Sequence, residues 1–254
     1  MSKVRVSAVK YTNSIPFIYG LQNYSIENEI SLCLDTPADC YNKLLTGNAD
    51  IGLVPVIIKN KTEGVHQVSD YCIGAYGDVL SVILASESPL HEVRTIVLDY
   101  QSKTSVLLTR LLCRNFWNIN PVFREAEPGF ENREFTPGEA RLIIGDRAFQ
   151  FHHKKDVFLT DLAGEWKRYS GLPFVFAIWA SVQKLPSGFE QKFNEALNFG
   201  MTHKVRLSKE MANLPEYNLI DLSLYLNSNI IHEINPPMQE GMNLFLHLIR
   251  DFQY

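Results

Sequence analysis

The sequence predicts an α/β fold of two lobes, each a mixed, mainly parallel sheet flanked by helices, with a ligand cleft between the lobes. Segments typical of strands and of helices alternate along the chain, which is the pattern of α/β proteins. The chain has 254 residues, of which 46% are apolar and 20% charged, enough for a core in one large domain or two lobes. Two short patterns also recur about ninety residues apart.

The first half of the chain alternates strands with helices. Ser14 and Pro16 suit the N-cap and the first turn of one helix, and Gly47 suits the end of another. Apolar runs bounded by turn residues indicate strands. The predicted elements are strands at residues 3–9, 29–34, 50–54 and 79–85 and helices at 15–21 and 37–45.

The second half continues this alternation and then becomes helical. Strands are predicted at 95–98, 122–124, 142–144, 157–159 and 174–181, with helices at 103–117 and 162–169. Three helices are predicted after residue 186, at 187–203, 216–227 and 237–251. Because strands joined by helices usually pair in parallel, mainly parallel sheets are expected.

Two similarities between the halves indicate lobes of similar design. Residues 47–56 (GNADIGLVPV) and 138–147 (GEARLIIGDR) both carry Gly-x-Ala and a charged residue before a short apolar strand, 91 residues apart. The loops that begin at Tyr11 and Tyr100 both lead from a strand into a helix, 89 residues apart. We expect one lobe from residues 1–87 plus 182–254 and the other from 88–181, with crossings near 86–91 and 179–187. Two crossings make a hinge that can close around a ligand.

Charge and hydrophobicity exclude several classes of protein. Lys plus Arg is 24 and Asp plus Glu is 28, a net charge of −4, and the densest basic stretches are two pairs, so no nucleic-acid partner is expected. The longest apolar run, residues 172–182, is far shorter than the ~20 residues of a membrane span. Four separated cysteines and an N-terminus that begins on a strand predict a cytoplasmic protein.

The familiar catalytic and cofactor motifs are absent from the sequence. It has no GxGxxG after a strand, no GxxxxGK[ST], no HExxH and no GxSxG, and its histidines show no metal-ligand spacing. His152 and His153 are adjacent, so their side chains diverge, and we interpret them as a surface or loop pair.

Small polar side chains remain where predicted strands meet helices. Ser102, Thr104 and Ser105 stand where a strand ends and a long helix begins, and Asn13 and Ser14 hold the same place in the first lobe. The free N–H groups and the positive end of a helix bind anions there. Each residue alone is more typical of an ordinary N-cap. Two such turns facing each other across a cleft would bind a small dicarboxylate.

Four further residues have two interpretations each. Gly145 and Asp146 end a strand at the expected cleft edge, where they either contact the ligand or cap the next short helix. Ser81 lies in an apolar strand, and its hydroxyl bonds either the neighbouring backbone or a ligand. Tyr11 is either a core aromatic or part of the cleft wall.

Several stretches carry a resemblance to a known family. They are KYTNSIPFIYGL (10–21), GNADIGLVPV (47–56), VLSVILAS (79–86), LDYQSKTSVLLTRLL (98–112), LIIGDRAF (142–149), TDLAGEWKRYSGLPFVFAIWA (160–180) and YLNSNIIHEINPPMQEGMNLFLHLI (225–249). Together they resemble the chorismate dehydratases of the futalosine route to menaquinone, which have a type II periplasmic-binding-protein fold. The family pattern at the first loop is Tyr-Leu-Asn before a proline. Here Thr12 replaces the leucine and Asn13 is kept.

The resemblance implies that the protein removes water from chorismate to give 3-[(1-carboxyvinyl)oxy]benzoate, without metal or organic cofactor. On this basis Asn13 is expected to hydrogen-bond near the reacting hydroxyl or enolpyruvyl group, and Ser81 to assist the leaving hydroxyl or position the substrate. Substrate binding is expected from Tyr11, Ser102, Thr104, Ser105, Gly145 and Asp146. The proton acceptor is either the side-chain carboxylate of the substrate or Asp146.

Three other functions compete with this interpretation. A transport solute-binding protein has the same fold but is expected to carry an export signal. A ligand-sensing regulatory domain is expected to carry a DNA-binding helix pair. The enzyme that makes 1,4-dihydroxy-6-naphthoate in the same pathway is expected to use a cleft histidine as base, for which His152 and His153 are the candidate positions.

Overall fold

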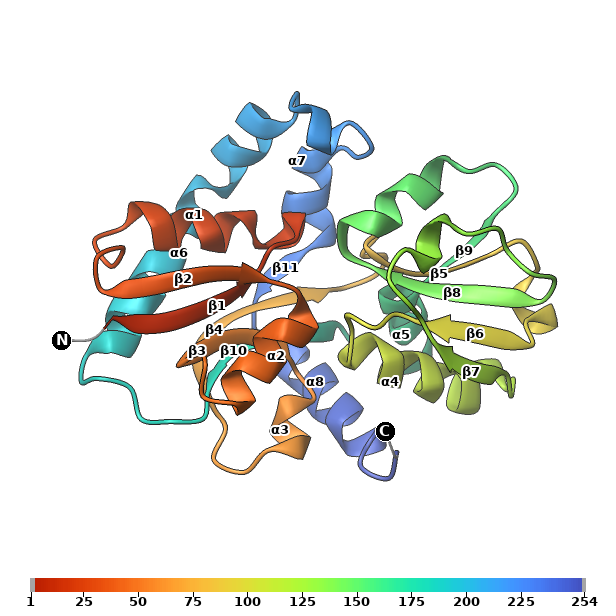
Figure 1. Cartoon of the computed structure of the whole chain (residues 1–254), viewed down its shortest axis with the longest axis horizontal. Helices are drawn as coiled ribbons and strands as arrows, with labels where there is room; N and C mark the ends of the chain where they lie inside the picture. Colours follow the sequence, from red (N-terminus) through yellow and green to blue (C-terminus); the bar gives the residue numbers. More distant parts are fainter. Residues whose placement is uncertain (1–2, 253–254) are drawn as a thin grey trace.

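The computed structural model describes residues 3–252 and shows two sheets, each covered by helices (Figure 1). The strand order of the first sheet is β11-β4-β10-β3-β1-β2, and that of the second is β7-β6-β8-β5-β9. The first sheet consists of β1 (Val4–Val9), β2 (Ile30–Asp35), β3 (Ile51–Pro55), β4 (His66–Ala75), β10 (Phe174–Ser181) and β11 (Ile231–Glu233). The second consists of β5 (Val82–Ser86), β6 (Thr95–Leu98), β7 (Val122–Glu125), β8 (Glu139–Ile144) and β9 (Phe158–Asp161). The predicted α/β class with two sheets is confirmed.

Helices connect and cover the sheets. They are α1 (Ile15–Asn23), α2 (Pro37–Leu45), α3 (Ile58–Lys61), α4 (Thr104–Leu112), α5 (Leu162–Ser170), α6 (Phe189–Met211), α7 (Leu222–Leu224) and α8 (Pro236–Leu248). Three short helical segments matter for the site: η1 (Thr12–Ser14), η5 (Gly145–His153) and η7 (Tyr225–Asn229). Figure 1 shows α1 and α2 on opposite sides of the first sheet.

The sheets are mixed, but the expected majority of parallel pairs is wrong. Within residues 3–252, β1 pairs in parallel with β2 and β3, and β6 with β7 and β8. The other five pairings, made by β4, β5 and β10 with their neighbours, are antiparallel. The antiparallel strands β5 and β10 are the first strands that the chain forms after it passes from one sheet to the other. Neither is therefore joined by a helix to a preceding strand of its own sheet, which is the connection that parallel pairing needs.

The two strands at the expected lobe boundaries lie in the opposite sheets. β5, expected in the first lobe, pairs with β8 and β9, and β10, expected in the second, pairs with β3 and β4. The chain therefore crosses earlier than expected, between β4 and β5 and between β9 and β10. Every residue of β5 and β10 is buried, so neither strand shows an alternation that would indicate its sheet. This strand membership favours lobes of about 3–78 plus 174–252 and 79–173.

The sequence pattern also missed two strands and predicted one continuous helix where the chain forms shorter segments. β4 was not expected because it mixes polar residues such as His66 and Asp70 with its apolar ones, and β11 is only three residues long. The expected helix at 216–227 is broken into η6 (Pro215–Tyr217), α7 and η7. The remaining predicted strands and helices are present, with ends shifted by a few residues, except that α6 runs on to Met211.

The C-terminal part of the chain packs back on the first lobe, as expected, through a close crossing of α1 and α6. A Cβ atom at Gly20 would lie 2.1 Å from the carbonyl oxygen of Ala196, and one at Gly200 would lie 1.9 Å from that of Pro16. Only glycine at both positions allows the two backbones to approach so closely. This crossing brings η7 and β11, which follow α6, back towards the pocket described below.

Aromatic side chains fill the core on both faces of β10. Trp179 meets Phe17 and Phe193 edge to face at centroid distances of 5.9 and 5.2 Å, and Trp166 meets Phe174 at 5.4 Å. Both tryptophans are fully buried. Edge-to-face contacts stabilise such clusters beyond the area they bury.

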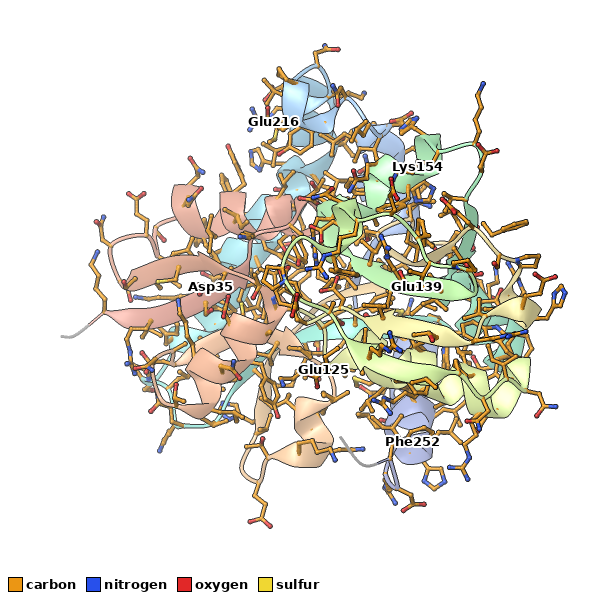
Figure 2. All side chains as sticks on the ribbon, turned by 45° about the vertical axis from the view of Figure 1, so that its right-hand side comes forward. Asp35, Glu125, Glu139, Lys154, Glu216 and Phe252 are labelled. Atoms are coloured by element: carbon orange, nitrogen blue, oxygen red, sulfur yellow. The ribbon has the colours of Figure 1, made fainter. Side chains whose placement is uncertain are left out.

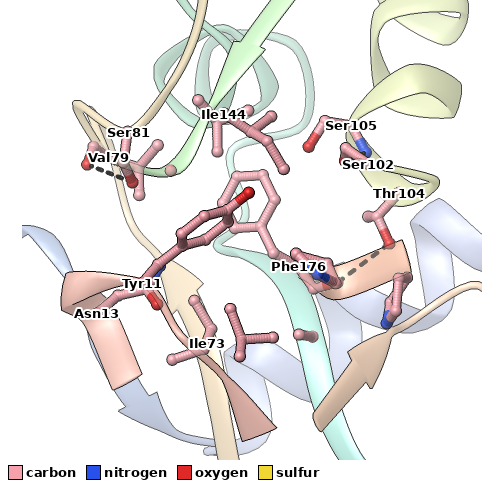
Figure 3. A pocket seen from close by; sticks show the side chains of 16 residues that line it. Tyr11, Asn13, Ile73, Val79, Ser81, Ser102, Thr104, Ser105, Ile144 and Phe176 are labelled. Carbon is pink, nitrogen blue, oxygen red and sulfur yellow. Dashed lines mark hydrogen bonds between the residues drawn. The ribbon is translucent and has the colours of Figure 1, made fainter. Parts of the chain in front are cut away.

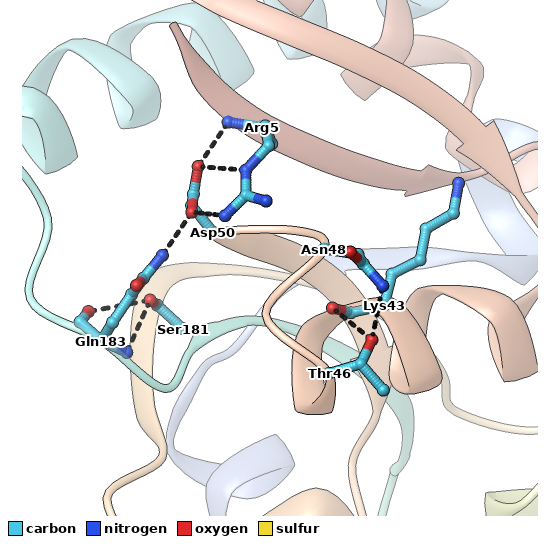
Figure 4. A network of polar contacts seen from close by, with 7 residues as sticks. All are labelled: Arg5, Lys43, Thr46, Asn48, Asp50, Ser181 and Gln183. Carbon is cyan, nitrogen blue, oxygen red and sulfur yellow. Dashed lines mark hydrogen bonds and ion pairs between the residues drawn. The ribbon is translucent and has the colours of Figure 1, made fainter. Parts of the chain in front are cut away.

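A surface network fastens the chain where it leaves β10 (Figure 4). The main-chain N–H of Arg5 and its guanidinium both donate to the Asp50 carboxylate, at 2.7 and 2.5 Å. The Gln183 side chain donates to the same carboxylate. Because Arg5 is exposed, the ion pair itself contributes little stability, and its effect is to join β1, β3 and the loop after β10.

The outer surface carries separate charges. Lys154 and Lys155, one of the two basic pairs, are exposed on the loop after η5, where Lys154 is labelled in Figure 2. Lys167 and Arg168, the other pair, contact Tyr76 and Glu165. Within residues 3–252, no helix combines the length and the apolar character needed to cross a bilayer.

Candidate functional site

A pocket of about 520 Å³, counting its opening to solvent, lies where the two sheets face each other (Figure 3). Seven of the eight predicted site residues line it: Tyr11, Asn13, Ser81, Ser102, Thr104, Ser105 and Gly145. They come from loops and helical segments that adjoin both sheets, at positions between 11 and 145 of the chain.

Most of the pocket wall is apolar. Figure 3 shows the rings of Tyr11 and Phe176 at its centre, with Ile73 and Ile144 beside them. Among the described residues, no side chain that lines the pocket is charged. The wall therefore suits the ring of a small ligand, and any charged group of that ligand has to be met by hydroxyls, amides and backbone N–H groups.

The N-terminus of α4 supplies such N–H groups. The first N–H groups of a helix have no acceptor within it and form its positive end. The Ser102 hydroxyl oxygen accepts the N–H of Ser105 at 3.0 Å, while among the described residues no acceptor is found for the N–H of Thr104. The Thr104 hydroxyl donates to the carbonyl of Phe176 at 3.1 Å, which joins α4 to β10 of the other lobe (Figure 3).

A buried carboxylate, Asp99, holds the loop that leads into α4. Asp99 accepts the N–H of Gln101 at 2.9 Å and that of Ile144 at 3.0 Å, and Arg147 donates to it at 2.6 Å. Burial raises the pKa of Asp99, and the Arg147 guanidinium opposes that rise. Asp99 thereby joins the loop before α4 to the end of β8, so both parts of the pocket wall are positioned by one side chain.

Ser81 follows a strained turn at the crossing between the sheets. Leu80 has a φ of 63°, which is costly for a residue with a branched side chain. The Asp161 carboxylate accepts the N–H groups of Val79 and Leu80 at 2.9 and 2.7 Å, and Gly145 donates its N–H to the carbonyl of Ser81 at 2.8 Å. These bonds hold the backbone of Ser81 against the strain.

Tyr11 closes the pocket by packing on a glycine of the other lobe. A Cβ atom at Gly145, whose φ is 67°, would lie 2.6 Å from the Tyr11 ring, so only glycine fits there. The Tyr11 hydroxyl donates to the side-chain oxygen of Gln101. Burial raises the pKa of Tyr11, so its hydroxyl stays protonated at neutral pH. Tyr11 is therefore part of the cleft wall and of the contact between the lobes.

Asp146 is the predicted site residue that lies outside the pocket lining. Its two carboxylate oxygens accept the backbone N–H of Thr12 at 3.1 and 3.2 Å. Burial raises the pKa of Asp146, and the hydrogen bond from Thr12 opposes that rise. The sequence allowed two roles for Asp146, a ligand contact or a helix cap. The structure shows a third role, a hydrogen bond that joins η5 of one lobe to η1 of the other.

The two adjacent histidines are exposed at the end of η5, as the surface interpretation predicted, and neither lines the pocket. His152 contacts the carbonyl of Leu80 and His153 that of Leu219, each at 2.8 Å through Nε2. A third histidine, His232 in β11, is buried and donates through Nε2 to the carbonyl of Asn13 at 2.9 Å. Burial lowers the pKa of His232 to about 3, so it stays neutral.

Sequence reasoning missed four residues that shape the site. Ile73 lies on β4, which was not predicted, and Phe176 lies on a strand that was assigned to the wrong lobe. Asp161 stands directly before the helix predicted at 162–169, an N-cap signal that could have identified it as a structural anchor. Tyr225 contacts Ser81. It lies in a helical stretch without a chemical motif, and the resemblance at residues 225–249 assigned it no role.

Solved structures confirm the periplasmic-binding-protein-like fold. A crystal structure of an Archaeoglobus fulgidus protein matches with a TM-score of 0.76 at 11% identity, covering 97% of this chain and 96% of that one. The periplasmic aliphatic sulphonate binding protein SsuA from Escherichia coli matches with a TM-score of 0.60 at 13% identity, covering 98% and 87%. At these identities the likeness shows the fold alone.

Two relatives share a name. A chorismate dehydratase from Thermus thermophilus is 26% identical over 228 residues, which cover 82% of this chain and 83% of the relative. A chorismate dehydratase from Campylobacter jejuni is 26% identical over 112 residues, covering 42% and 48%. The sequence profile of a family described as menaquinone biosynthesis matches residues 4–251. With nearly its whole length matched, the chain belongs to the menaquinone biosynthesis family.

Proposed function

We propose that this protein is a hydro-lyase that converts chorismate to 3-[(1-carboxyvinyl)oxy]benzoate, an early step of menaquinone biosynthesis by the futalosine pathway. The observation that carries the proposal is a pocket with an apolar wall, hydrogen-bond donors from both lobes and the N-terminus of α4. Such a pocket matches a ring that bears two carboxylates and a hydroxyl. The family and the names of the two relatives agree with it.

The reaction does not need a strong acid or base from the protein. The C3–H bond of the ring and the C4–O bond break, a double bond forms between C3 and C4, and water leaves as the ring becomes aromatic. The gain in aromaticity drives the step, so the enzyme supplies mainly orientation and stabilisation of negative charge. In our proposal Asn13 and Ser81 donate hydrogen bonds at the reacting end, and the first turn of α4 holds a carboxylate.

The proton acceptor in this proposal is the side-chain carboxylate of the substrate. Asp146, the other candidate, already accepts the N–H of Thr12 with both oxygens and does not line the pocket. The uncharged lining of the described pocket supports the same choice. No cofactor enters the step. We place the reaction in the cytoplasm, whose reducing conditions suit the four free cysteines.

The test is to incubate the purified protein with chorismate and follow the product by mass spectrometry. Formation of a product lighter by one water, absent with heat-denatured protein, supports the proposal. Tight binding of chorismate or another small acid without conversion contradicts it and favours a binding protein. Turnover of a later intermediate to 1,4-dihydroxy-6-naphthoate would contradict it in favour of the other enzyme of the pathway.

Ionisation of Asp161 is expected to control turnover on the acid side. Burial raises its pKa to about 6, and only the carboxylate can accept the N–H groups of both Val79 and Leu80 with one oxygen while capping α5 with the other. Protonation removes one of these acceptors and releases the turn before Ser81. A pH profile of kcat/KM should therefore rise with pH through about 6.

Stability is expected to change in the opposite direction. Because the folded-state pKa of Asp161 is raised, its protonation stabilises the fold, and this contribution is lost as pH rises through about 6. Thermal unfolding across the same pH range separates the two effects.

Asp161→Asn should lower kcat and abolish the acid limb of the kcat/KM profile, whereas Asp50→Asn, which removes a carboxylate away from the pocket, should keep that limb. An acid limb unchanged in Asp161→Asn would contradict this prediction.

A further inference from the structure

A buried tyrosine from the far end of the chain contacts Ser81. Tyr225 lies in η7 and is 1% exposed, and its hydroxyl donates to the Ser81 Oγ at 2.8 Å. Tyr225 does not line the pocket, whereas Ser81 does. The phenol therefore stands behind the serine, on the side away from the ligand.

The direction of this hydrogen bond decides where the Ser81 hydrogen can go. A phenol is a stronger hydrogen-bond donor than an alkyl hydroxyl, so Tyr225 donates and Ser81 accepts. The Ser81 oxygen is then an acceptor toward Tyr225, and its own hydrogen needs another acceptor. Among the described residues the only one recorded is the carbonyl of Val79 at 3.5 Å, which is long for a hydroxyl bond. The hydrogen of Ser81 is thus available to an oxygen in the pocket.

Asn13, which also lines the pocket, keeps its amide group as a donor. The Ser14 hydroxyl donates to the Asn13 Oδ1 at 3.1 Å, which leaves the amide NH₂ as the free end of that side chain.

Packing fixes the phenol in this position. The Tyr225 ring meets Phe149 of η5 edge to face at a centroid distance of 5.1 Å, so it is held from the second lobe as well. His232 holds the backbone of Asn13 through its carbonyl. A fixed donor costs no reorganisation when charge develops in the pocket.

We infer that Tyr225 is a positioning residue, whose hydroxyl orients Ser81 so that the serine donates its hydrogen to an oxygen of the ligand. This inference rests on the proposed function, because it assigns Ser81 to the reacting end of chorismate. It adds a residue of the C-terminal segment to the site and gives that segment a part in the chemistry.

The experiment is a double-mutant cycle of Tyr225→Phe and Ser81→Ala, with kcat and KM for chorismate measured for each variant. Tyr225→Phe keeps the ring that packs on Phe149 and removes the donor alone. We expect kcat to fall about five- to tenfold with KM nearly unchanged, and no further fall when Ser81 is already alanine. Tyr71→Phe is the matched control, since it removes a tyrosine hydroxyl that bonds Asn198 away from the pocket.

Each outcome decides the inference. A wild-type kcat in Tyr225→Phe, a loss that adds fully to that of Ser81→Ala, or an equal loss in Tyr71→Phe overturns it and leaves the proposed function standing. If the wild-type protein does not convert chorismate, the proposed function fails, and the same four proteins are compared by thermal unfolding. A shift in Tm for the double variant equal to the sum of the single shifts then overturns the inference, and a smaller shift supports the Tyr225–Ser81 bond.

Discussion

Replacement of either Asn13 or Ser81 by alanine is expected to lower kcat for chorismate dehydration by about 10²–10³, the usual cost of one donor that stabilises developing negative charge. Both side chains line the pocket, both are more than nine-tenths buried, and both have a donor hydrogen available to the ligand. Because the described pocket lining carries no charged side chain, such neutral donors have to meet the developing charge.

Steady-state kinetics with product detection by mass spectrometry measures this effect. Ser69→Ala is a suitable control, since Ser69 is also a buried serine, and its hydroxyl donates to Asn194 away from the pocket. The control should keep wild-type kcat. Near-full turnover by the Asn13 and Ser81 variants would show that neither side chain takes part in the reaction.

Replacement of Gly145 by alanine is expected to lower kcat/KM about 10²-fold, because it disturbs the closed arrangement of both lobes. The added Cβ would lie 2.6 Å from the Tyr11 ring, so Tyr11 has to move. Its bond to Gln101 across the cleft would then be lost, and Ser81, which accepts the Gly145 N–H, would shift as well. A displacement of about 1 Å in such a site costs a factor of this size.

Backbone strain alone has to be separated from this steric effect. Gly47 has a φ of 69°, close to the 67° of Gly145, but a Cβ atom there would meet nothing within 4 Å. Both variants should lose about 1–2 kcal/mol of stability from backbone strain in chemical unfolding, since both place alanine in the left-handed region. Gly145→Ala should lose more, because its Cβ also clashes with the Tyr11 ring. Only Gly145→Ala should also lose activity. Equal activity in the two variants would contradict the role of the Tyr11–Gly145 contact.

The pocket residues could be predicted because they follow a rule of chain order. Asn13 lies in η1 and Thr104 begins α4, and each of these segments follows a strand of a parallel pair. Such strand ends lie at one edge of their sheet. Ser81 was undecided in the sequence between a bond to the backbone and a place in the cleft. Its placement in the pocket lining came from the structure.

Other parts of the site could not be predicted, because they depend on contacts between distant segments. Tyr225 and Ser81 are 144 positions apart, and their meeting requires α6 to cross α1 closely enough to bring η7 back. Asp146 was expected at the ligand and bonds Thr12 of the other lobe. The pattern around each of these residues is that of an ordinary turn or helix.

The amino-acid sequence by itself determined the α/β class, most of the strands and helices, the two-sheet design and the small polar residues that end beside the pocket. These follow from periodicity and from turn and cap residues, which act over a few positions of the chain. Only the tertiary structure decided which sheet β5 and β10 join and which side chains stand behind Ser81. The physical reason is that a fully buried strand is apolar on both faces, so its partners are chosen by packing and by long-range hydrogen bonds that no local pattern records.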